Sequence, residues 1–476
     1  MSTLTLTGFD LTITDLVTAA RSTGLITLSP DSLDRIRENR AFAERVAARG
    51  DDVYGLTTGV GVRAKRRIDP AEMVRFNQRL LREHATGQGP ALPADVARAA
   101  AIHLLNMLAA GRTNVRLGIA LLLAERLSLG ATARIRMFGS TGMGDVVPLA
   151  DLIAGLLGDA ELAAGEALPL IGQSSVVTAH AALALHDAQT LLATLPALAA
   201  LDLEAFAANP TPFHPRGGRL RPYPGYQRAL ADLGRLLEGS HLWTDQPRHL
   251  QAPLSFRNAA SVLGAAFDSL GFCEQQIAIE LNAHQQNPLV LPEEDRMLPV
   301  AHFDMQAIAI ALDLARIALA PCLTAQAERS LKLLQASHSG LTDGLEPRGD
   351  NTGHGLSELA WPLQAITAEA RLLIQPVSAE IGSATQAEGV EDRMTMAALG
   401  ARRLAEMVGL GFRVAAISTV VACQAIDLRG VERLAPPLRM LHDDVRATIP
   451  ALAPGDPPPA DLEPLIMVLR DGLLSR

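Results

Sequence analysis

A glycine-rich segment near the start of the chain carries a tyrosine that is suited to proton transfer. Residues 53–61 read VYGLTTGVG, so three glycines lie within the seven residues that follow Tyr54. Glycine permits positive φ angles and a close approach of the backbone, which lets a loop tyrosine reach into a site. A free tyrosine has a pKa of about 10. It therefore acts as a base near neutral pH only where cations or donated hydrogen bonds stabilise the phenolate.

Three further side chains can exchange protons or bind charge. His84 ends a predicted helix beside a Gly-rich turn, and histidine titrates near neutral pH. Arg257 follows Gln251 in residues 251–257, which read QAPLSFR. Its planar guanidinium suits a carboxylate, which favours an acidic small-molecule substrate. Glu391 and the aspartate after it begin another predicted helix, where paired carboxylates can also simply complement the helix dipole.

The elements that position these residues are predicted to be helices. Hydrophobic residues make up 48% of the 476-residue chain and aromatic residues only 3%, and alanine and leucine supply most of the apolar mass. This composition favours closely packed helices over sheets. Helical periodicity recurs over residues 14–21, 30–49, 70–82, 93–110, 114–129, 147–158, 176–208, 255–286, 302–336, 355–377 and 394–428.

The longest of these helices set the expected architecture. Such helices need partners along their whole length, which an elongated bundle provides. We therefore predict an all-α fold with an elongated central bundle and a smaller N-terminal part that carries the Tyr54 loop. The expected division is residues 1–200 for the N-terminal part, 201–430 for the central bundle and 431–476 for a helical tail.

Charge and cysteine usage exclude several classes of function. The formal net charge is −9 with no long run of either sign, which argues against nucleic acid or an anionic membrane as the main partner. The three cysteines are widely spaced and form no CxxC pair, so no metal site is expected. The sequence has no signal-peptide pattern and no uninterrupted apolar run of about 18 residues. We therefore expect a soluble cytoplasmic protein.

A short loop resembles the cofactor-forming loop of the histidine/phenylalanine ammonia-lyase family. Residues 139–149 read GSTGMGDVVPL, where the family reads Gly-Ser-x-Gly-Ala-Ser-Gly-Asp-Leu-x-Pro-Leu. In the family the Ala-Ser-Gly triplet becomes an electrophilic prosthetic group, 4-methylideneimidazol-5-one (MIO). Here the loop is one residue shorter and carries Gly142, Met143 and Gly144 before the aspartate. Methionine has no β-hydroxyl to eliminate, so we predict that MIO is absent and that no other cofactor replaces it.

Further segments, from about residue 50 to residue 430, are similar to motifs of the same family. The glycine-rich loop is similar to Tyr-Gly-x-Asn-Thr-Gly-Phe-Gly, and residues 280–289, ELNAHQQNPL, to Glu-Leu-Asn-x-x-x-Asp-Asn-Pro-Leu. Residues 302–306, HFDMQ, match Asn-Phe-His-Gly-Gln, and residues 390–396, VEDRMTM, match Gln-Glu-Asp-His-Val-Ser-Met. A histidine and two glutamines at 284–286 stand where small or acidic residues are usual, which predicts an altered pocket.

This resemblance implies roles for individual residues. Tyr54 is the expected catalytic base, and Gly61 of the same loop and His84 belong to the same catalytic group. Arg257 matches the arginine that clamps the substrate carboxylate. The other residues that the resemblance places at the substrate are Gln251, Asn282, Phe303, Asp304 (in place of a family histidine) and Glu391 (a glutamate that contacts the substrate amine in histidine-type enzymes).

The departures from the family gather around the cofactor. Besides the loop serine, the second family tyrosine is replaced by Leu254, and the asparagine of Leu-Ile-Asn-Gly-Thr is missing from LIGQSS at residues 170–175. Tyr54, the expected base, and Arg257, the expected carboxylate clamp, are both retained. Without its electrophile, the expulsion of ammonia from an unactivated amino acid lacks its main driving interaction. A substrate with a better leaving group, or with a more acidic C–H, would not need it.

Three hypotheses follow for the function. The first is an MIO-free, lyase-like enzyme of specialised metabolism that performs elimination, isomerisation or cyclisation of an amino-acid-like carboxylate. The second is a true ammonia-lyase or aminomutase with an unusual triplet. The third is a non-catalytic binding or scaffold homologue. Because family active sites are assembled from several subunits, the resemblance also implies a homotetramer.

The mass of the intact protein separates the first two hypotheses. Formation of MIO removes two waters from the chain, whereas Met143 cannot dehydrate. We predict that the purified protein has the mass of its unmodified sequence in whole-chain mass spectrometry. A mass lower by two waters would contradict the prediction.

Overall fold

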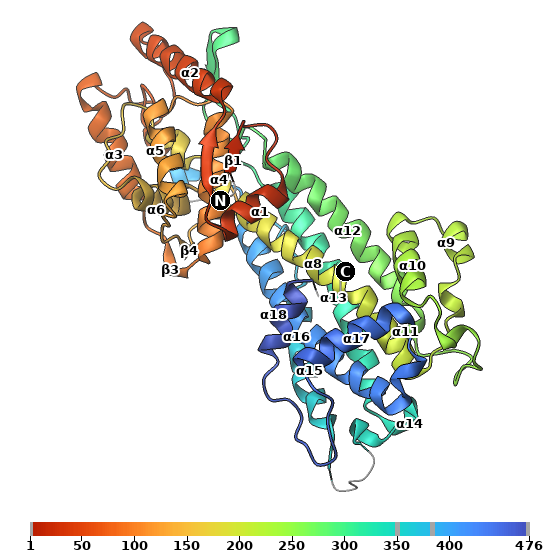
Figure 1. Cartoon of the computed structure of the whole chain (residues 1–476). Helices are drawn as coiled ribbons and strands as arrows, with labels where there is room; N and C mark the ends of the chain where they lie inside the picture. Colours follow the sequence, from red (N-terminus) through yellow and green to blue (C-terminus); the bar gives the residue numbers. More distant parts are fainter. Residues whose placement is uncertain (1–2, 348–352, 381–385, 473–476) are drawn as a thin grey trace. The chain divides into compact units, whose positions relative to one another are not determined.

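Helices dominate the computed structural model, which describes residues 3–347, 353–380 and 386–472 (Figure 1). The predicted all-α class is therefore confirmed. The α-helices are α1 (Ile13–Arg21), α2 (Pro30–Arg49), α3 (Met73–His84), α4 (Ala94–Ala109), α5 (Leu117–Ser128), α6 (Val146–Leu157), α7 (Ala167–Ile171), α8 (Ser175–Phe206), α9 (Arg216–Leu220), α10 (Pro224–Leu236), α11 (Leu254–Arg257), α12 (Ala259–Glu280), α13 (Gln306–Leu333), α14 (Ala336–Ser339), α15 (Ala360–Leu372), α16 (Ala397–Arg429), α17 (Pro436–Thr448) and α18 (Glu463–Arg470).

Three two-stranded pairs tie loops together within the described chain. Strands β1 (Thr3–Leu6) and β2 (Leu25–Leu28) are parallel, and β5 (Leu289–Leu291) and β6 (Arg296–Leu298) are antiparallel. The antiparallel pair of β3 (Gln88–Ala91) and β4 (Arg136–Phe138) matters most for the site. It joins the segment that follows His84 to the segment that precedes the 139–149 loop.

The contacts divide the chain into two compact units, each assembled from three stretches of sequence. Unit 1 comprises residues 1–186, 273–313 and 376–402, and unit 2 comprises residues 187–272, 314–375 and 403–476. The long helices α8, α12, α13 and α16 contribute residues to both units. The expected boundaries at residues 200 and 430 both lie inside unit 2, and the three-part division stays a prediction.

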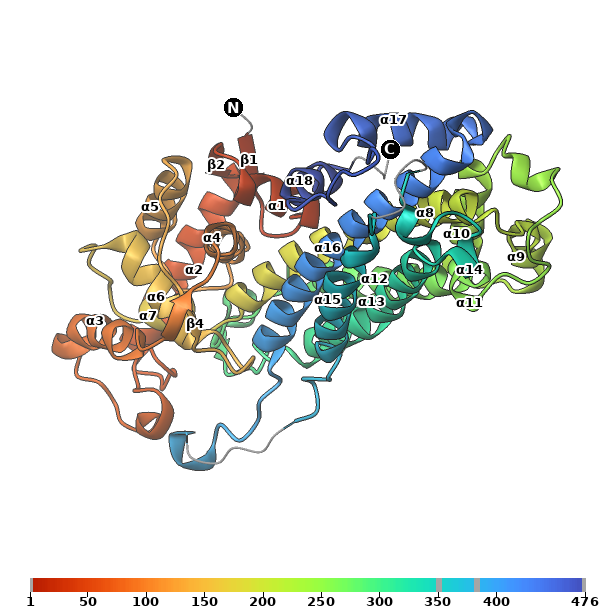
Figure 2. The same cartoon turned by 90° about the horizontal axis from the view of Figure 1, so that it is seen from below.

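Long helices pack against one another in the core of unit 2, where α13, α15 and α16 lie side by side (Figure 2). The hydroxyl groups of Ser330 on α13 and Ser418 on α16 are 2.8 Å apart. Arg329 forms a buried ion pair with Asp202 of α8, with 2.7 Å between Nε and Oδ2. Small and polar side chains thus fix how these helices meet within the unit.

Among the described residues, three helical stretches are apolar and long enough to cross a membrane by length and composition alone. They span residues 167–206, 306–333 and 397–429, and 100%, 61% and 72% of their most apolar windows are buried inside the structure. This burial accounts for their hydrophobicity as bundle core. The cytoplasmic location stays a prediction.

One long helix predicted from the sequence is wrong. A single helix was expected over residues 255–286, but α11 ends at Arg257 and α12 runs only from Ala259 to Glu280. The Asn282 side chain explains the early end. Its amide donates to the backbone carbonyl of Leu11 at 3.0 Å, and its oxygen accepts from the Leu11 backbone amide at 2.9 Å. Because these bonds hold Asn282 against the Leu11 backbone, the chain leaves the helix after Glu280 and forms a turn.

In unit 1, α3 is joined to α7 by Asn77, which is buried. Its side-chain oxygen accepts from the backbone amide of Ala167 at 2.9 Å, and its amide donates to the carbonyl of Met73 at 2.8 Å. The next residue of α7, Leu168, packs beneath the Tyr54 loop: a Cβ at Gly55 would lie 2.4 Å from Leu168 Cδ2. Asn77 therefore helps to hold the surface on which the loop rests.

We predict that Asn77→Ala lowers the free energy of unfolding by about 1–3 kcal/mol, because the Ala167 amide is left buried without an acceptor. Urea unfolding followed by circular dichroism measures this. As a control, Gln78→Ala on the same helix should change the value by no more than about 0.5 kcal/mol. Equal effects of the two substitutions would contradict the role given to Asn77.

Candidate active site

The Tyr54 loop places a hydrogen-bond donor on the phenolic oxygen. The backbone amide of Gly61 donates to Tyr54 Oη at 2.9 Å, and the tyrosine is half-buried. A donated N–H stabilises negative charge on an oxygen. The structure therefore supplies one of the interactions that a tyrosine base requires, and it brings Tyr54 and Gly61 into direct contact.

Hydrogen bonds within the loop hold this geometry. The Thr57 hydroxyl accepts from the backbone amide of Val53 at 2.8 Å and donates to the carbonyl of Asp51 at 2.6 Å. The backbone amide of Gly59 donates to the carbonyl of Arg66 at 2.9 Å. Thr57, which stands in place of the family asparagine, thus stabilises the loop by hydrogen bonds to its backbone.

His84 is tied to its own helix. Its Nδ1 lies 2.7 Å from the carbonyl oxygen of Leu80. Because a carbonyl oxygen only accepts, Nδ1 carries the proton in this bond and the neutral ring keeps its lone pair on Nε2. The ring is therefore oriented as an acceptor at Nε2, and its catalytic role stays a prediction.

The loop that carries Met143 is fixed by contacts from two other segments. The carbonyl of Gly142 accepts from the Thr395 hydroxyl at 2.8 Å and from the Met305 backbone amide at 3.3 Å. Gly142 has a φ of +81°, and a Cβ there would lie 2.0 Å from Thr395 Oγ1. Met143 pairs with Asp304 in an isolated antiparallel bridge. The residues present do not fit an MIO group, since a methionine stands between the two glycines.

Phe303 and Asp304 line the same loop. Phe303 lies beside Gly144, where a Cβ would be 3.9 Å from Phe303 Cβ. Asp304 Oδ1 accepts from the backbone amide of Gln306 at 2.9 Å and so caps α13, while Oδ2 pairs with Arg393 Nη1 at 2.5 Å. The structure thus brings Gly142, Met143, Gly144, Phe303 and Asp304 into one cluster.

Arg393 was not predicted from the sequence. It joins Asp304 to Glu380, whose Oε1 lies 2.8 Å from Arg393 Nε. The available signal was its position, because an arginine replaces the histidine of the family motif while an aspartate replaces the histidine at residue 304. The two replacements together give an ion pair, which each motif alone did not reveal.

Asp145, at the end of the same loop, is fully buried. Its backbone amide donates to the carbonyl of Gln173 at 2.7 Å, and Oδ2 accepts from the backbone amide of Val177 at 2.8 Å. Within the described residues Oδ1 has no partner. Burial raises the pKa of Asp145 to about 6, although hydrogen bonds from Ser140 and the Val177 amide oppose the rise.

Two buried glutamines stand at the predicted altered pocket. Gln285 is fully used: its oxygen accepts from the Ser174 backbone amide at 3.0 Å, and its nitrogen donates to Glu280 Oε2 at 2.7 Å. Gln286 is also buried, but neither amide atom has a partner among the described residues, and the same holds for Nε2 of Gln173. Buried amides of this kind are available to a polar ligand.

Arg257 and Gln251 lie together in unit 2, whereas the other predicted site residues belong to unit 1. Arg257 Nη1 donates to Gln251 Oε1. The Arg257 Nε is buried and has no partner within the described residues. Phe256 anchors the short helix α11 by stacking on Phe206, with 4.2 Å between ring centroids. One edge of the guanidinium therefore keeps a free donor.

Asn282 and Glu391 are placed less favourably for substrate. The Asn282 amide is occupied by the backbone of Leu11. Glu391 is exposed, although its segment approaches the Tyr54 loop: a Cβ at Gly61 would lie 3.9 Å from Ala387 Cβ. Their substrate-binding roles stay predictions. In the part of the chain that the structure describes, no group of three or more His, Cys, Asp or Glu side chains could hold a metal ion.

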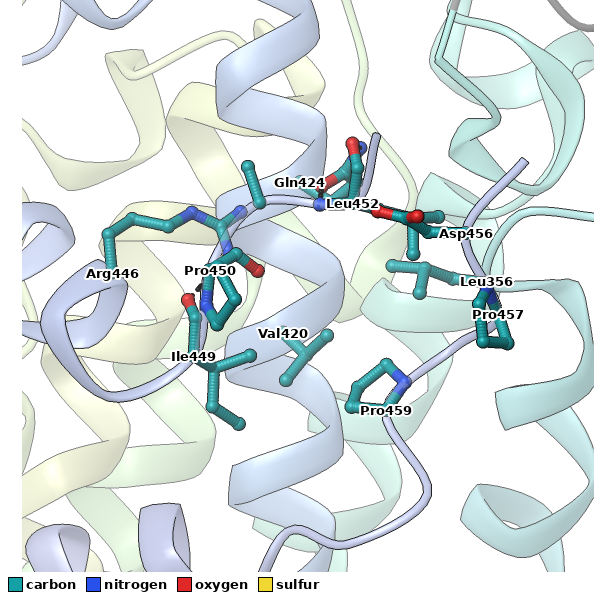
Figure 3. A pocket seen from close by; sticks show the side chains of 11 residues that line it. Leu356, Val420, Gln424, Arg446, Ile449, Pro450, Leu452, Asp456, Pro457 and Pro459 are labelled. Atoms are coloured by element: carbon teal, nitrogen blue, oxygen red, sulfur yellow. Dashed lines mark hydrogen bonds between the residues drawn. The ribbon is translucent and has the colours of Figure 1, made fainter. Parts of the chain in front are cut away.

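A cavity of about 220 Å³ in unit 2 contains none of the predicted site residues (Figure 3). The side-chain amide of Gln424 bonds in both directions to the backbone of Leu452. Arg446 donates to the carbonyl of Ile449 at 3.2 Å and to Asp427 at 2.6 Å. The polar groups of this cavity hold the proline-rich tail segment in place.

The sequence matches the family model described as aromatic amino acid lyase over residues 11–163 and 159–447. The chain belongs to the aromatic amino acid lyase family. It is 32% identical to the histidine ammonia-lyase of Gloeobacter violaceus, over 99% of this chain and 96% of that protein. It is 31% identical to the histidine ammonia-lyase of Symbiobacterium thermophilum, over 98% and 96% of the two chains. The chain is accordingly a carbon–nitrogen lyase-like enzyme.

Solved structures of lyases and aminomutases share this fold. The tyrosine aminomutase of Streptomyces globisporus superposes with a TM-score of 0.92 at 26% identity, covering 99% of this chain and 98% of that one. The ergothionase of Treponema denticola, an ergothioneine-degrading enzyme, also gives 0.92, at 24% identity and 99% coverage of both chains. The expected ammonia-lyase-like architecture is confirmed.

Asp145 gives the site a testable pH dependence. Burial raises its pKa from 3.8 to about 6, so the folded state holds this proton more tightly than the unfolded state does. The side chain therefore costs the fold stability as the pH rises from about 4 through about 6, and the cost levels off above about pH 7.

We predict that Asp145→Asn, which cannot ionise, becomes more stable relative to the wild type over this range. Urea unfolding at several pH values between about 4 and about 7.5 measures the difference. A difference that is constant across the range would contradict the burial of an ionisable carboxyl group at this position.

Proposed function

We propose that this enzyme promotes elimination, isomerisation or cyclisation of an amino-acid-like carboxylate without an MIO group. Tyr54 is the base and Arg257 is the carboxylate clamp. The observation that carries the proposal is the hydrogen bond from the Gly61 amide to Tyr54 Oη at 2.9 Å, in a chain that has Met143 in place of the loop serine. The Gly61 amide supports Tyr54 as a base, whereas Met143 stands in place of the serine from which the family forms its electrophile.

In the proposed elimination, the Tyr54 phenolate takes a proton from a carbon of the bound substrate. The electrons of the C–H bond form the new double bond, and the leaving group departs from the neighbouring carbon with its bonding pair. The Gly61 amide lowers the energy of the phenolate that starts the step. Isomerisation or cyclisation begins with the same proton transfer and differs in where the electrons go next.

Arg257 is the proposed clamp for the substrate carboxylate. Its buried Nε has no partner among the described residues, while Nη1 is held by Gln251. A guanidinium that is fixed on one side and free on the other binds a carboxylate with little loss of side-chain entropy. We propose that Arg257 takes the substrate carboxylate in this way.

The leaving group follows from the missing electrophile. Ammonia is expelled poorly without activation, so the proposed substrate carries a better leaving group or a more acidic C–H. The histidine ammonia-lyase relatives and the fold shared with an ergothioneine-degrading enzyme make histidine and ergothioneine the first two compounds to assay. Turnover of ergothioneine but not histidine would fit the proposal.

A homotetramer is part of this proposal. Helices α12 and α13 expose large apolar side chains, with Ile279 62% and Ile310 48% exposed. Apolar helix faces of this kind are usually covered by a partner chain. We further propose that the enzyme acts in the cytoplasm on a small molecule and binds neither nucleic acid nor membrane, as its net charge of −9 favours.

A true ammonia-lyase with an unusual triplet is the second candidate. It is favoured by the 32% identity to a histidine ammonia-lyase over nearly the whole chain. Ammonia release from histidine, together with a mass lower by two waters, would replace the proposal with this candidate.

We predict that Tyr54→Phe lowers turnover by about 10²–10⁴-fold, since only the phenolic oxygen is removed and a positioned base contributes about that much. Ligand affinity and the circular dichroism spectrum should stay nearly unchanged. Steady-state kinetics on any substrate found in the screen measures the effect. Full activity of the variant would show that another residue takes the proton, with His84 and Asp304 the first to test.

Arg257→Ala is predicted to act on binding. It should raise the dissociation constant of a carboxylate ligand by about tenfold or more, because charge-assisted hydrogen bonds are lost. Arg257→Lys should recover only part of the affinity, since an ammonium lacks the planar fork. Unchanged carboxylate affinity of Arg257→Ala, measured by calorimetry, would contradict the clamp.

A further inference from the structure

A cavity of about 440 Å³ lies beside the Tyr54 loop in unit 1, and arginines dominate its lining. Its lining comes from residues 59–69, which include the end of the loop and the segment after it, from Glu72 and from one side of α3. Five arginines line it, namely Arg63, Arg66, Arg67, Arg75 and Arg79. A volume of this size is typical of small-molecule sites, which measure about 300–1,000 Å³.

Three of these arginines are not neutralised. Arg67 pairs with Asp52 at 2.7 Å, and Arg79 pairs with Glu83 at 2.6 Å. Across residues 3–347, 353–380 and 386–472, the side chains of Arg63, Arg66 and Arg75 form no ion pair within 4.0 Å. The cavity therefore presents guanidinium groups that are free to bind.

The carboxylates of the cavity do not cancel this charge. Three acidic residues line the cavity against five arginines. Glu83 is held by Arg79 at 2.6 Å, the Asp69 side chain accepts from the backbone amide of Ala71 at 2.9 Å, and Glu72 is the third. Residues 61–84 contain seven lysines and arginines against three acidic residues, in a chain whose net charge is −9. A local positive field of this kind in an acidic protein selects small anions.

We propose that this cavity binds a small polyanion that carries phosphate groups. Guanidinium forks match phosphoryl oxygens with paired hydrogen bonds, and several of them suit a ligand with more than one negative charge. Phe76 and Ile68 also line the cavity and give an apolar surface for the rest of the molecule. This site is additional to the proposed active site and does not depend on its chemistry.

The position of the cavity couples it to the Tyr54 loop. The backbone amide of Gly59 donates to the carbonyl of Arg66 at 2.9 Å, and the amide of Ile68 donates to the carbonyl of Thr57 at 3.0 Å. The arginine-bearing segment is thus paired with the loop that contains Tyr54. A ligand that bridges Arg66 to Arg75 of α3 steadies this pairing.

Isothermal titration calorimetry of the full chain with pyrophosphate tests the proposal, with inorganic phosphate and citrate as further probes. The double variant Arg66→Gln with Arg75→Gln should bind pyrophosphate at least about tenfold more weakly. The matched control is Lys65→Gln with Arg82→Gln. It removes the same charge from the same two segments, but neither residue lines the cavity. Its affinity should stay within about threefold of the wild type.

Hydrogen–deuterium exchange adds a readout of the coupling. Pyrophosphate should slow amide exchange over residues 57–68 in the wild type and not in the Arg66→Gln, Arg75→Gln variant. Unchanged exchange in the wild type would overturn the coupling. No pyrophosphate binding at millimolar concentration, or equal losses in the two double variants, would overturn the site. Citrate binding as tightly as pyrophosphate would overturn the preference for phosphate.

Discussion

The candidate site depends on the hydrogen bond that the Gly61 amide donates to the phenolic oxygen of Tyr54. The loop that brings this amide back to the tyrosine holds Gly55 and Gly61 at positive φ angles of 72° and 55°. Leu168 of α7 supports the loop from below, and Asn77 of α3 holds α7 in place. The position of the proposed base, Tyr54, thus rests on packing and hydrogen bonds some distance from the phenol.

A second constraint surrounds the loop of Met143. Family members build an electrophile there, and the chain instead holds the loop by backbone hydrogen bonds and by the bridge to Asp304. The Asp304–Arg393 ion pair joins the two segments that contact this loop, one near residue 304 and the other near residue 395. The loop is held by these contacts, and Met143 stands where the resemblance places the serine needed for the family cofactor. Proton transfer without an electrophile is the chemistry that we propose for such a site.

Local signals in the sequence predicted most of the fold. Helix α2 is an example: periodicity predicted a helix over residues 30–49, and in the structure Ser29 caps its start and Gly50 ends it in a left-handed conformation. Local sequence signals do not predict tertiary contacts. The end of α12 at Glu280 depends on Asn282 bonding to a segment 271 residues away. Likewise the Tyr54–Gly61 loop was identified from its motif, but the Arg393 ion pair depends on residues distant in the sequence. A motif shows which residues are present, whereas contacts between residues far apart in the sequence are seen only in the folded structure.

The central claim is that Tyr54 removes a proton from a carboxylate substrate without an electrophile. A crystal structure of the protein with a bound amino-acid-like carboxylate tests it most directly, through the distance between Tyr54 Oη and the acidic carbon of the ligand. The account predicts a distance of about 3–3.5 Å, with the carboxylate on Arg257 and Met143 unmodified. A ligand whose acidic carbon faces a different base, or a cyclised backbone at residues 142–144, would contradict it.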